Sequence, residues 1–150
     1  MKNKPGTHFR QKVTIDEIEF DSKREATFYQ NFVKGKVARF TYHPKFTIDE
    51  QFPIGGRVMK AKTYVPDFLI YDEEGDWTHV IDIKTGFNFK AIDSGTRDKF
   101  RLFAKFYHFP VEIVVPSTKT FRMKILGLVG GFDDIRMSSL DYQVRDLIGN

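Results

Sequence analysis

Residues 63–86, TYVPDFLIYDEEGDWTHVIDIKTG, contain two apolar strands on either side of an acidic turn. Side chains alternate along a strand with a period of two, so Asp82 and Lys84 share one face of the second strand, opposite the face of its isoleucines. Burying an unpaired carboxylate or amine in so apolar a segment costs roughly several kcal/mol. Something must therefore compensate this charged face, and a divalent metal ion is one candidate.

The composition describes a folded, aromatic-rich protein. The chain has 150 residues, of which 41% are hydrophobic and 16 are phenylalanine. This is enough to bury a sizeable core within one domain. We expect that domain to span residues 13–150, after a mobile basic segment at residues 1–12.

Several classes of protein are excluded by composition. The chain contains no cysteine, so it has no disulfide framework, thiol nucleophile or thiolate metal site. It contains no signal peptide and no apolar run near the roughly 18 residues that span a bilayer. We expect a soluble, cytoplasmic protein without a membrane partner.

Charge is unevenly distributed along the chain. The formal net charge is +4, with ten Lys or Arg against five Asp or Glu in residues 1–48, three against eight in residues 49–83, and six against two in residues 84–110. Basic flanks favour a polyanionic partner and an acidic centre favours a metal ion, a combination more typical of a nuclease than of a passive nucleic-acid binder. The alternative is that these charges only solvate the surface.

A helix is predicted to begin at Ser22, after a small hairpin over residues 13–20. Ser22 and Glu25 have the S-x-x-E spacing of a capping box, and Gly35 is a suitable C-terminal stop. The apolar stripe of this helix comprises Phe28, Tyr29, Phe32 and Val33. Glu25 has two interpretations: it caps the helix by reaching back to the Ser22 amide, which the local sequence favours, or it points toward a functional site with the apolar stripe.

Residues 39–52 and 57–71 are predicted to form a β-hairpin or meander around a turn at residues 53–56. Proline cannot donate to a strand ladder, so Pro66 indicates an edge, a bulge or a bend in the second strand. A bend there would re-aim the neighbouring carboxylate of Asp67. The alternative is an ordinary strand irregularity.

A second helix is predicted over residues 96–109. Arg97, Arg101 and Lys105 recur along one of its faces as a basic ridge. A solvated helix face is the ordinary explanation, but three cations without an acidic partner on the same ridge also suit a phosphate backbone. Together with Lys99, they are the candidate DNA contacts.

Residues 111–115 form a continuous apolar run typical of a buried strand. The order strand, helix, strand predicts a right-handed βαβ crossover with a parallel pair. Residues 121–126 are predicted to form a half-buried strand and residues 140–148 a short amphipathic helix. The predicted fold class is therefore α/β, with a mixed central β-sheet flanked by helices.

The acidic residues fall into a recurrent pattern. Asp67 follows a proline, Asp82 lies fifteen positions later, and Lys84 completes a D-x-K motif. With Glu25 on a preceding helix, this arrangement resembles the PD-(D/E)xK nuclease superfamily. The segments IDEIEFDSKREATFY, HPKF, TYVPDF and DIKTG also look like small phage-encoded proteins placed in that superfamily near Holliday-junction-resolvase-like enzymes, a likeness that covers roughly residues 13–115.

The resemblance implies a restriction-endonuclease-like fold and a metal-dependent DNA endonuclease. In such enzymes the motif acids, the carbonyl between acid and lysine, and the helix glutamate hold Mg²⁺ or Mn²⁺. The corresponding groups are Asp67, Asp82, Ile83 and Glu25. Lys84 would orient or help deprotonate the attacking water and offset charge on the phosphate. The alternative for Asp82 and Lys84 is a simple ion pair within the sheet.

The resemblance also implies the kind of substrate. We expect branched or otherwise structured DNA, such as a Holliday junction, to be cut during phage replication or recombination in the host cytoplasm. Two symmetric cuts would suit a homodimer. Two alternatives stay open: a non-catalytic DNA-binding module of the same fold, and a nuclease with another role, such as an exonuclease or a transposase-associated end-cutting subunit.

Other chemistries fit the sequence less well. The four histidines lack metal-ligand spacing and are predicted to be structural or surface residues; they are His8, His43, His79 and His108. The acidic turn at residues 72–76 lacks the spacing of a calcium loop and is predicted to be solvated. No serine-hydrolase, phosphate-binding-loop or dinucleotide fingerprint occurs in the sequence.

Overall fold

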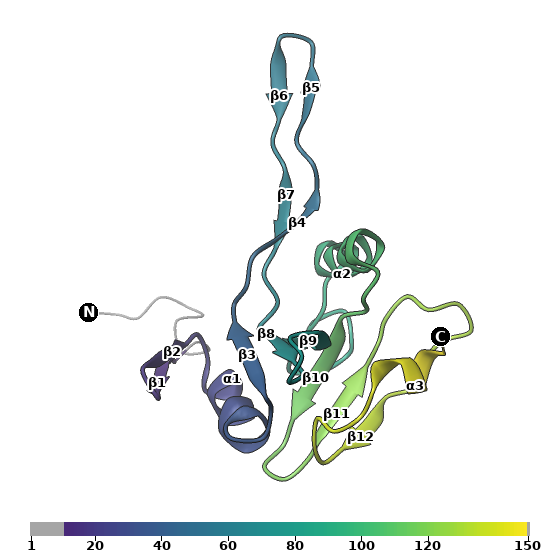
Figure 1. The fold of residues 1–150 in the computed structure, drawn as a ribbon. Coiled ribbons are helices and arrows are strands. Elements are labelled where there is room, and N and C mark those ends of the chain that lie inside the picture. Colours follow the sequence, from purple (N-terminus) through teal and green to yellow (C-terminus); the bar gives the residue numbers. More distant parts are fainter. Residues whose placement is uncertain (1–10, 150) are drawn as a thin grey trace.

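The computed structural model describes residues 11–149, so most of the predicted basic segment at residues 1–12 lies outside the described residues. The strands of its largest sheet are β3 (Arg39–Tyr42), β8 (Phe68–Tyr71), β9 (Trp77–Ile83), β10 (Glu112–Pro116), β11 (Phe121–Lys124) and β12 (Ile135–Met137). Their order is β12-β11-β10-β9-β8-β3 (Figure 1). No helix within residues 11–149 is both long and apolar enough to cross a membrane.

The middle of the sheet confirms the predicted βαβ crossover. Strand β9 pairs in antiparallel with β8 and in parallel with β10, and helix α2 (Ser94–Tyr107) connects the two parallel strands. Parallel neighbours need such a crossover, because a tight turn joins only antiparallel strands. Helix α2 begins before the predicted residue 96, because Asp93 caps it by accepting a hydrogen bond from the Thr96 amide at 2.8 Å.

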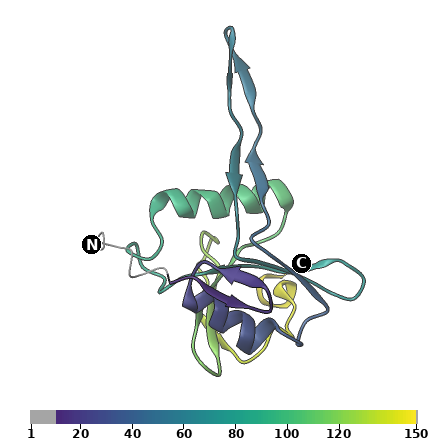
Figure 2. The same ribbon diagram turned by 90° about the vertical axis from the view of Figure 1, so that its left-hand side faces the viewer.

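Helices cover both faces of the sheet (Figures 1 and 2). One face packs against α1 (Lys23–Phe28) and the π-helical turn η1 (Tyr29–Val33) that continues it, and the other packs against α2. Alternate residues of β9 face opposite layers, so Ile81 packs in the first cluster and Val80 in the second. Asp82 therefore points to the side of the sheet that α2 covers.

The predictions for the two ends of the chain are confirmed in outline. Strands β1 (Val13–Ile15) and β2 (Ile18–Phe20) form the expected hairpin, and α1 begins directly after Ser22. Helix α3 (Val144–Ile148) is shorter than the predicted range 140–148. The strand predicted over residues 121–126 ends at Lys124.

The strand predicted over residues 39–52 is divided in the structure. His43 adopts a left-handed conformation (φ 55°) and Pro44 has no amide to donate, so β3 ends and the chain turns. The next strands are β4 (Phe46–Asp49), β5 (Phe52–Ile54), β6 (Arg57–Met59) and β7 (Lys62–Tyr64). Pro66 lies in the break between β7 and β8, which confirms the predicted bend beside Asp67.

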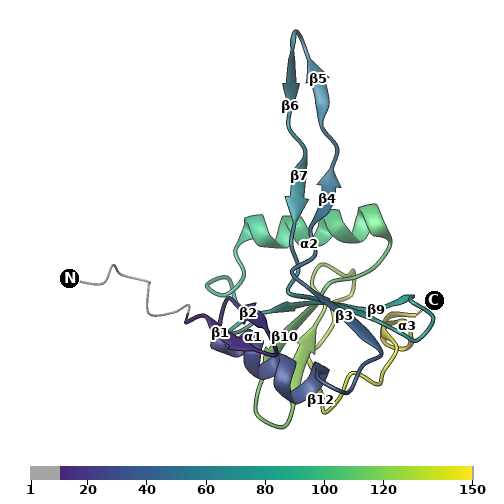
Figure 3. The same ribbon diagram turned by 60° about the vertical axis from the view of Figure 1, so that its left-hand side comes forward.

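Residues 46–64 form a projecting hairpin. Strand β4 pairs with β7, and β5 pairs with β6, each pair as a separate two-stranded sheet. All three views show this hairpin extending away from the central sheet, beyond α2 (Figures 1, 2 and 3). The predicted hairpin is thus confirmed, but neither of its two strand pairs joins the central sheet.

Candidate functional site

The two motif carboxylates lie near one another where β8 begins and β9 ends. Phe68 of β8 pairs with Ile81 of β9 at the end of this ladder; Asp67 directly precedes Phe68, and Asp82 directly follows Ile81. The Asp67 amide also donates to the Ile81 carbonyl, at 2.9 Å, so the pairing is irregular at Asp67. The pairing of Phe68 with Ile81 thus brings the two acids to the same end of the two strands.

Asp82 is a buried carboxylate with two protein partners, and it is only 4% exposed. Its Oδ2 accepts a hydrogen bond from the Tyr64 hydroxyl at 2.6 Å, and its Oδ1 lies 2.6 Å from Lys84 Nζ without a well-aligned hydrogen bond. Burial and the neighbouring carboxylate raise the pKa of the Tyr64 hydroxyl well above its usual value, so it stays a donor. The predicted shared face of Asp82 and Lys84 is confirmed, and the two residues form an ion pair.

Asp67 is held between a backbone amide and an imidazole. Its Oδ2 accepts a hydrogen bond from the Ile83 amide at 2.6 Å, and its Oδ1 lies 3.3 Å from His43 Nε2. Burial raises the pKa of Asp67 to about 7, and the nearby charges of Asp82 and Glu25 act in the same direction against the hydrogen bonds. The hydrogen bonds from the Ile83 amide and His43 therefore do not fully offset the burial of Asp67 and the negative charge around it.

The structure separates the two interpretations of Glu25. The helix cap is made by Ser22, whose Oγ accepts from the Glu25 amide at 3.1 Å. The Glu25 carboxylate does not complete the box through the Ser22 amide; it accepts from the hydroxyls of Ser22 and Tyr42 and contacts His43 Nε2, each at 2.9 Å. Burial opposes its ionisation, but these hydrogen bonds outweigh burial and hold the pKa of Glu25 below its usual value. Glu25 thus points into the site.

His43 joins Glu25 and Asp67, and the sequence analysis missed it by assigning it a structural or surface role. Its Nε2 lies between Glu25 Oε1 at 2.9 Å and Asp67 Oδ1 at 3.3 Å. Burial lowers the pKa of the imidazole, but the two carboxylates outweigh this effect and raise it to about 10. The signal that reveals His43 is the pairing of β3 with β8, because Tyr42 opposite Phe68 places His43 opposite Asp67.

Glu25 and Asp67 border an open pocket of about 390 Å³, whereas His43 is not among its lining residues. The pocket lies among the start of α1, the end of β9 and the loop that follows it. Its lining residues include Arg24, Glu25, Asp67, Ile83, Lys84 and Lys90. Asp82 does not line the pocket and meets it only through Lys84. The pocket therefore brings together four of the predicted site residues, namely Glu25, Asp67, Ile83 and Lys84. Asp82 lies behind the pocket lining, where it contacts Lys84.

The donor set suits a hard divalent cation. One oxygen each from Glu25 and Asp67 and a ring nitrogen of His43 lie within 4.8 Å of one another. Carboxylate oxygens are the ligands that Mg²⁺ and Mn²⁺ prefer. The raised pKa of Asp67, caused first by burial and then by neighbouring negative charge, is an imbalance that such a cation would relieve.

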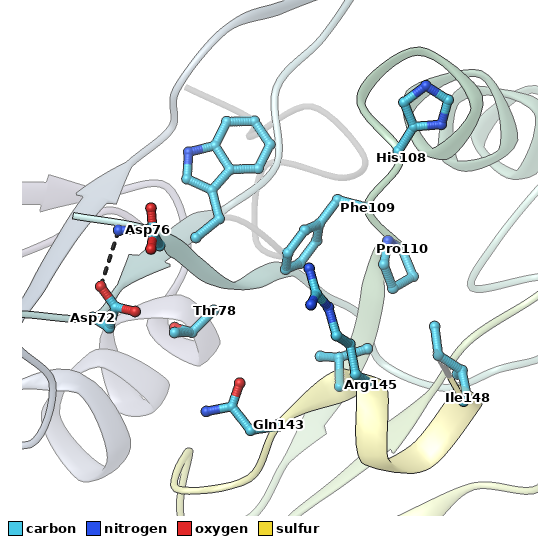
Figure 4. A pocket seen from close by; sticks show the side chains of 12 residues that line it. Asp72, Asp76, Thr78, His108, Phe109, Pro110, Gln143, Arg145 and Ile148 are labelled. Atoms are coloured by element: carbon cyan, nitrogen blue, oxygen red, sulfur yellow. Dashed lines mark hydrogen bonds between the residues drawn. The ribbon is translucent and has the colours of Figure 1, made fainter. Parts of the chain in front are cut away.

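A larger pocket lies elsewhere, and none of the predicted site residues lines it. It measures about 540 Å³ and lies between the β8–β9 turn, the end of α2 and α3 (Figure 4). On its rim, Asp72 Oδ1 accepts hydrogen bonds from the amides of Glu74 and Asp76, both at 2.9 Å. These bonds shape the acidic turn, where Gly75 adopts the positive φ of 88° that a residue with a Cβ rarely adopts.

The candidate DNA contacts on α2 fall into two groups. Lys99, Arg101 and Lys105 are exposed. Arg97 instead holds the preceding loop, since its guanidinium donates to the carbonyls of Ile92 at 3.0 Å and Phe87 at 3.2 Å. These loop contacts engage two of its N–H groups, and a DNA contact by Arg97 stays a prediction.

Comparison with known families of proteins shows where this chain belongs. The model of the family described as "Protein of unknown function (DUF1064)" matches residues 7–121. No curated protein and no solved structure matches the chain. The matched range contains Glu25, His43, Asp67, Asp82 and Lys84 and extends from before β1 to the first residue of β11. Because this range is more than half of the sequence, the chain belongs to the DUF1064 family of proteins of unknown function.

Proposed function

We propose that this chain is a metal-dependent deoxyribonuclease that hydrolyses phosphodiester bonds, and that its α/β fold is a variant of the restriction-endonuclease-like fold. The observation that carries the proposal is the convergence of a carboxylate before β8, a helix glutamate and a lysine at one open pocket, with the β9 carboxylate paired to that lysine behind the pocket lining. These residues are Asp67, Asp82, Glu25 and Lys84. Perturbed acids grouped beside a pocket are typical of catalytic sites.

The metal would be Mg²⁺ or Mn²⁺, held by the carboxylates of Glu25, Asp67 and Asp82 with the Ile83 carbonyl as a further oxygen donor. Such an ion, when bound, supplies Lewis-acid polarisation of the scissile phosphate and an activated water. Asp82 would join this set by sharing the oxygen that now pairs with Lys84. Asp67 is kept in place for the same purpose by the Ile83 amide.

Lys84 is the group suited to act on the phosphate. Its ammonium borders the pocket and is anchored 2.6 Å from Asp82 Oδ1. From there it would donate to a phosphate oxygen or orient the attacking water, and offset the charge that develops in the transition state. His43 has a positioning role, because its Nε2 holds the carboxylates of Glu25 and Asp67 together.

Branched DNA, such as a Holliday junction in phage replication or recombination, is the proposed substrate class. Its polyanionic character is supported by three cations of the pocket lining, which lie beside the carboxylates of that lining; the cations are Arg24, Lys84 and Lys90. The branch is proposed from the resemblance to Holliday-junction-resolvase-like proteins. Paired cuts in such a junction need two sites, so we also propose a homodimer in the host cytoplasm.

A non-catalytic DNA-binding module of the same fold is the second candidate. One observation favours it: Asp82 and Lys84 already form an ion pair within the sheet. An exonuclease or a transposase-associated end-cutting nuclease would use the same groups and differ only in where it cuts.

The test is incubation of the protein with end-labelled four-way, flap, duplex and single-stranded DNA in Mg²⁺, Mn²⁺ or EDTA. We expect the four-way junction to be cut at internal positions with either metal and to stay intact in EDTA. Single-nucleotide products would instead identify an exonuclease. Binding of DNA without cleavage under every condition would support the binding module and contradict the nuclease.

Lys84→Ala should cut poorly yet still bind metal, with the exposed Lys119→Ala as its control.

A further inference from the structure

The projecting hairpin, residues 46–64, is fixed at its base. Phe46 and Tyr64 are paired across its two strands, and both pack against Phe103 of α2 with ring centroids 5.2 and 5.7 Å apart. The Tyr107 hydroxyl of α2 donates to a backbone carbonyl of the hairpin at 2.8 Å. The direction in which the hairpin extends in Figures 2 and 3 is therefore set by its contacts with α2.

The outer half of the hairpin exposes large apolar side chains to solvent. Phe52, Ile54, Val58 and Met59 are 47%, 58%, 63% and 50% exposed. Phe52 lies opposite Met59, and Pro53 lies opposite Val58 at the next position of the ladder, so both faces of the two-stranded sheet carry apolar groups. A two-stranded hairpin alone is at best marginally stable in water, and exposed apolar surface of this kind marks a binding site.

The same part of the hairpin is basic. Arg57, Lys60 and Lys62 are exposed, and residues 51–62 contain no Asp or Glu. Phosphates complement these cations, and the faces of the bases complement the apolar tip. Nucleic acid therefore matches both the charge and the apolar surface of the hairpin. Contact between the tips of two copies would bring like charges together, which opposes self-association there.

The hairpin is directly connected to the candidate site. Strand β4 begins three residues after His43, and β7 ends at Tyr64, three residues before Asp67. The Tyr64 hydroxyl donates to Asp82 at 2.6 Å. Nine residues on the first side (46–54) and eight on the second (57–64) separate this base from the turn, a length of about 26–30 Å at roughly 3.3 Å per residue. That span corresponds to about eight or nine base pairs of duplex at roughly 3.4 Å per pair.

We propose that the projecting hairpin is a nucleic-acid contact element that grips DNA beside the candidate site. Arg57, Lys60 and Lys62 contact phosphates. Ile54 and Met59 press against base faces where stacking is interrupted. A two-stranded ribbon fits the major groove, and apolar wedges of this type separate base steps. Separation costs least where bases are already unpaired, so the hairpin favours gapped or branched DNA over continuous duplex.

The proposal shares its DNA substrate with the proposed nuclease but needs neither metal nor cleavage, so it is tested by binding in EDTA. For the tip, Ile54→Ser/Met59→Ser should raise the Kd for gapped or four-way DNA at least about fivefold while changing the Kd for continuous duplex less than about twofold. Val129→Ser is the matched control, because Val129 is fully exposed and lies outside the hairpin.

For the cations, Arg57→Gln/Lys60→Gln/Lys62→Gln should reduce the slope of log Kd against log salt by up to about 2.7, or about 0.9 for each phosphate contact. The loss should be similar for all base sequences, because phosphates carry no base identity. The exposed Lys119→Gln is the control and should leave the slope unchanged.

A direct readout uses the absence of cysteine from the sequence. Ile54→Cys provides a single thiol for an environment-sensitive fluorophore, whose emission should shift to shorter wavelength on binding gapped DNA. The same label at Val129→Cys should not respond.

Two results would overturn the proposal. One is an unchanged Kd and salt slope in both hairpin variants. The other is conversion of a dimer to a monomer by the tip variant, measured by sedimentation, with DNA binding unaltered; the hairpin would then contact a second copy of the chain. Hairpin-dependent binding without cleavage in any metal would contradict only the proposed nuclease function.

Discussion

Among single residues, His43 balances the charge of Glu25 and Asp67. Burial alone lowers its pKa, but hydrogen bonds to the two carboxylates raise it from its usual 6.5 to about 10. A histidine with a raised pKa contributes stability that is fully present below its unfolded pKa and is lost as pH rises through its folded pKa. For His43, this window runs from about pH 6.5 to about pH 10.

We predict that His43→Gln flattens the decline in the free energy of unfolding across that window. The pKa of Asp67 is raised to about 7, chiefly by burial, so ionisation of Asp67 also lowers the free energy of unfolding as pH rises. The pH dependence of the wild-type protein alone therefore does not isolate the contribution of His43. The measurement is urea denaturation in EDTA at a series of pH values, for wild type, His43→Gln and the exposed control His108→Gln. Parallel curves for wild type and His43→Gln would contradict the assignment.

Glu25→Gln separates the helix cap from the site. The cap joins Ser22 Oγ to the Glu25 backbone amide and survives the change, and the glutamine side chain can still accept from Tyr42. We expect the free energy of unfolding to change by less than about 1 kcal/mol. Loss of a metal-binding charge should lower the cleavage rate about 10- to 100-fold. The control is Glu19→Gln, on the exposed hairpin β1–β2. An unchanged cleavage rate would return Glu25 to a structural role.

At the scale of elements, a buried polar network joins β9, β10 and the C-terminal segment. His79 Nδ1 lies 2.7 Å from Glu112 Oε2, and its Nε2 donates to the Leu140 carbonyl at 2.9 Å. The Tyr142 hydroxyl donates to the other Glu112 oxygen. His79 is 1% and Glu112 0% exposed, so each of these bonds replaces one to water.

Tyr142→Phe should lower the free energy of unfolding by about 1–3 kcal/mol, because it leaves a buried oxygen of Glu112 without its donor. Urea denaturation measures this loss, and Asp141→Asn on the exposed neighbouring residue is the control. DNA binding should be unaltered by either change. Equal stability of Tyr142→Phe and wild type would mean that the network does not attach the C-terminal segment to the sheet.

Helix α2 has one cation bonded to its own preceding loop and three exposed cations. Lys99→Ala/Arg101→Ala/Lys105→Ala should reduce the salt slope of DNA binding by up to about 2.7 without lowering stability. Arg97→Ala should lower stability but leave the salt slope of DNA binding nearly unchanged, because it removes the donors to the carbonyls of Ile92 and Phe87. Anisotropy titrations at several salt concentrations and thermal melting distinguish the two variants. A wild-type slope for the triple variant would exclude the helix from the DNA interface.

At the scale of the whole molecule, local signals located most elements. Strand alternation located β9 with the Asp82–Lys84 face, and the Ser22 cap located α1, because both depend on neighbouring residues. His43 was missed because its role depends on the β3–β8 register across 24 positions of sequence.

The projecting hairpin was not predicted to leave the sheet, for a related reason. Its exposed apolar residues give the same alternating pattern as a half-buried strand, and only tertiary contacts decide which strands join the sheet. Likewise, nothing local indicated that Arg97 would turn to the carbonyls of its own loop.

The proposed activity is tested most directly by comparing Asp82→Asn with wild type. The measurement is the cleavage of a four-way DNA junction in the presence of a divalent metal ion. Asparagine keeps the volume of Asp82 but presents one oxygen to Tyr64 and Lys84, so a stability loss of about 1–3 kcal/mol is expected and folding is checked by circular dichroism. Asp76→Asn, in the acidic turn away from the site, is the matched control. We predict that wild type and Asp76→Asn cut the junction in Mg²⁺, that EDTA abolishes cutting, and that folded Asp82→Asn binds the junction without cutting it. A wild-type cleavage rate for Asp82→Asn would contradict the assignment of this site.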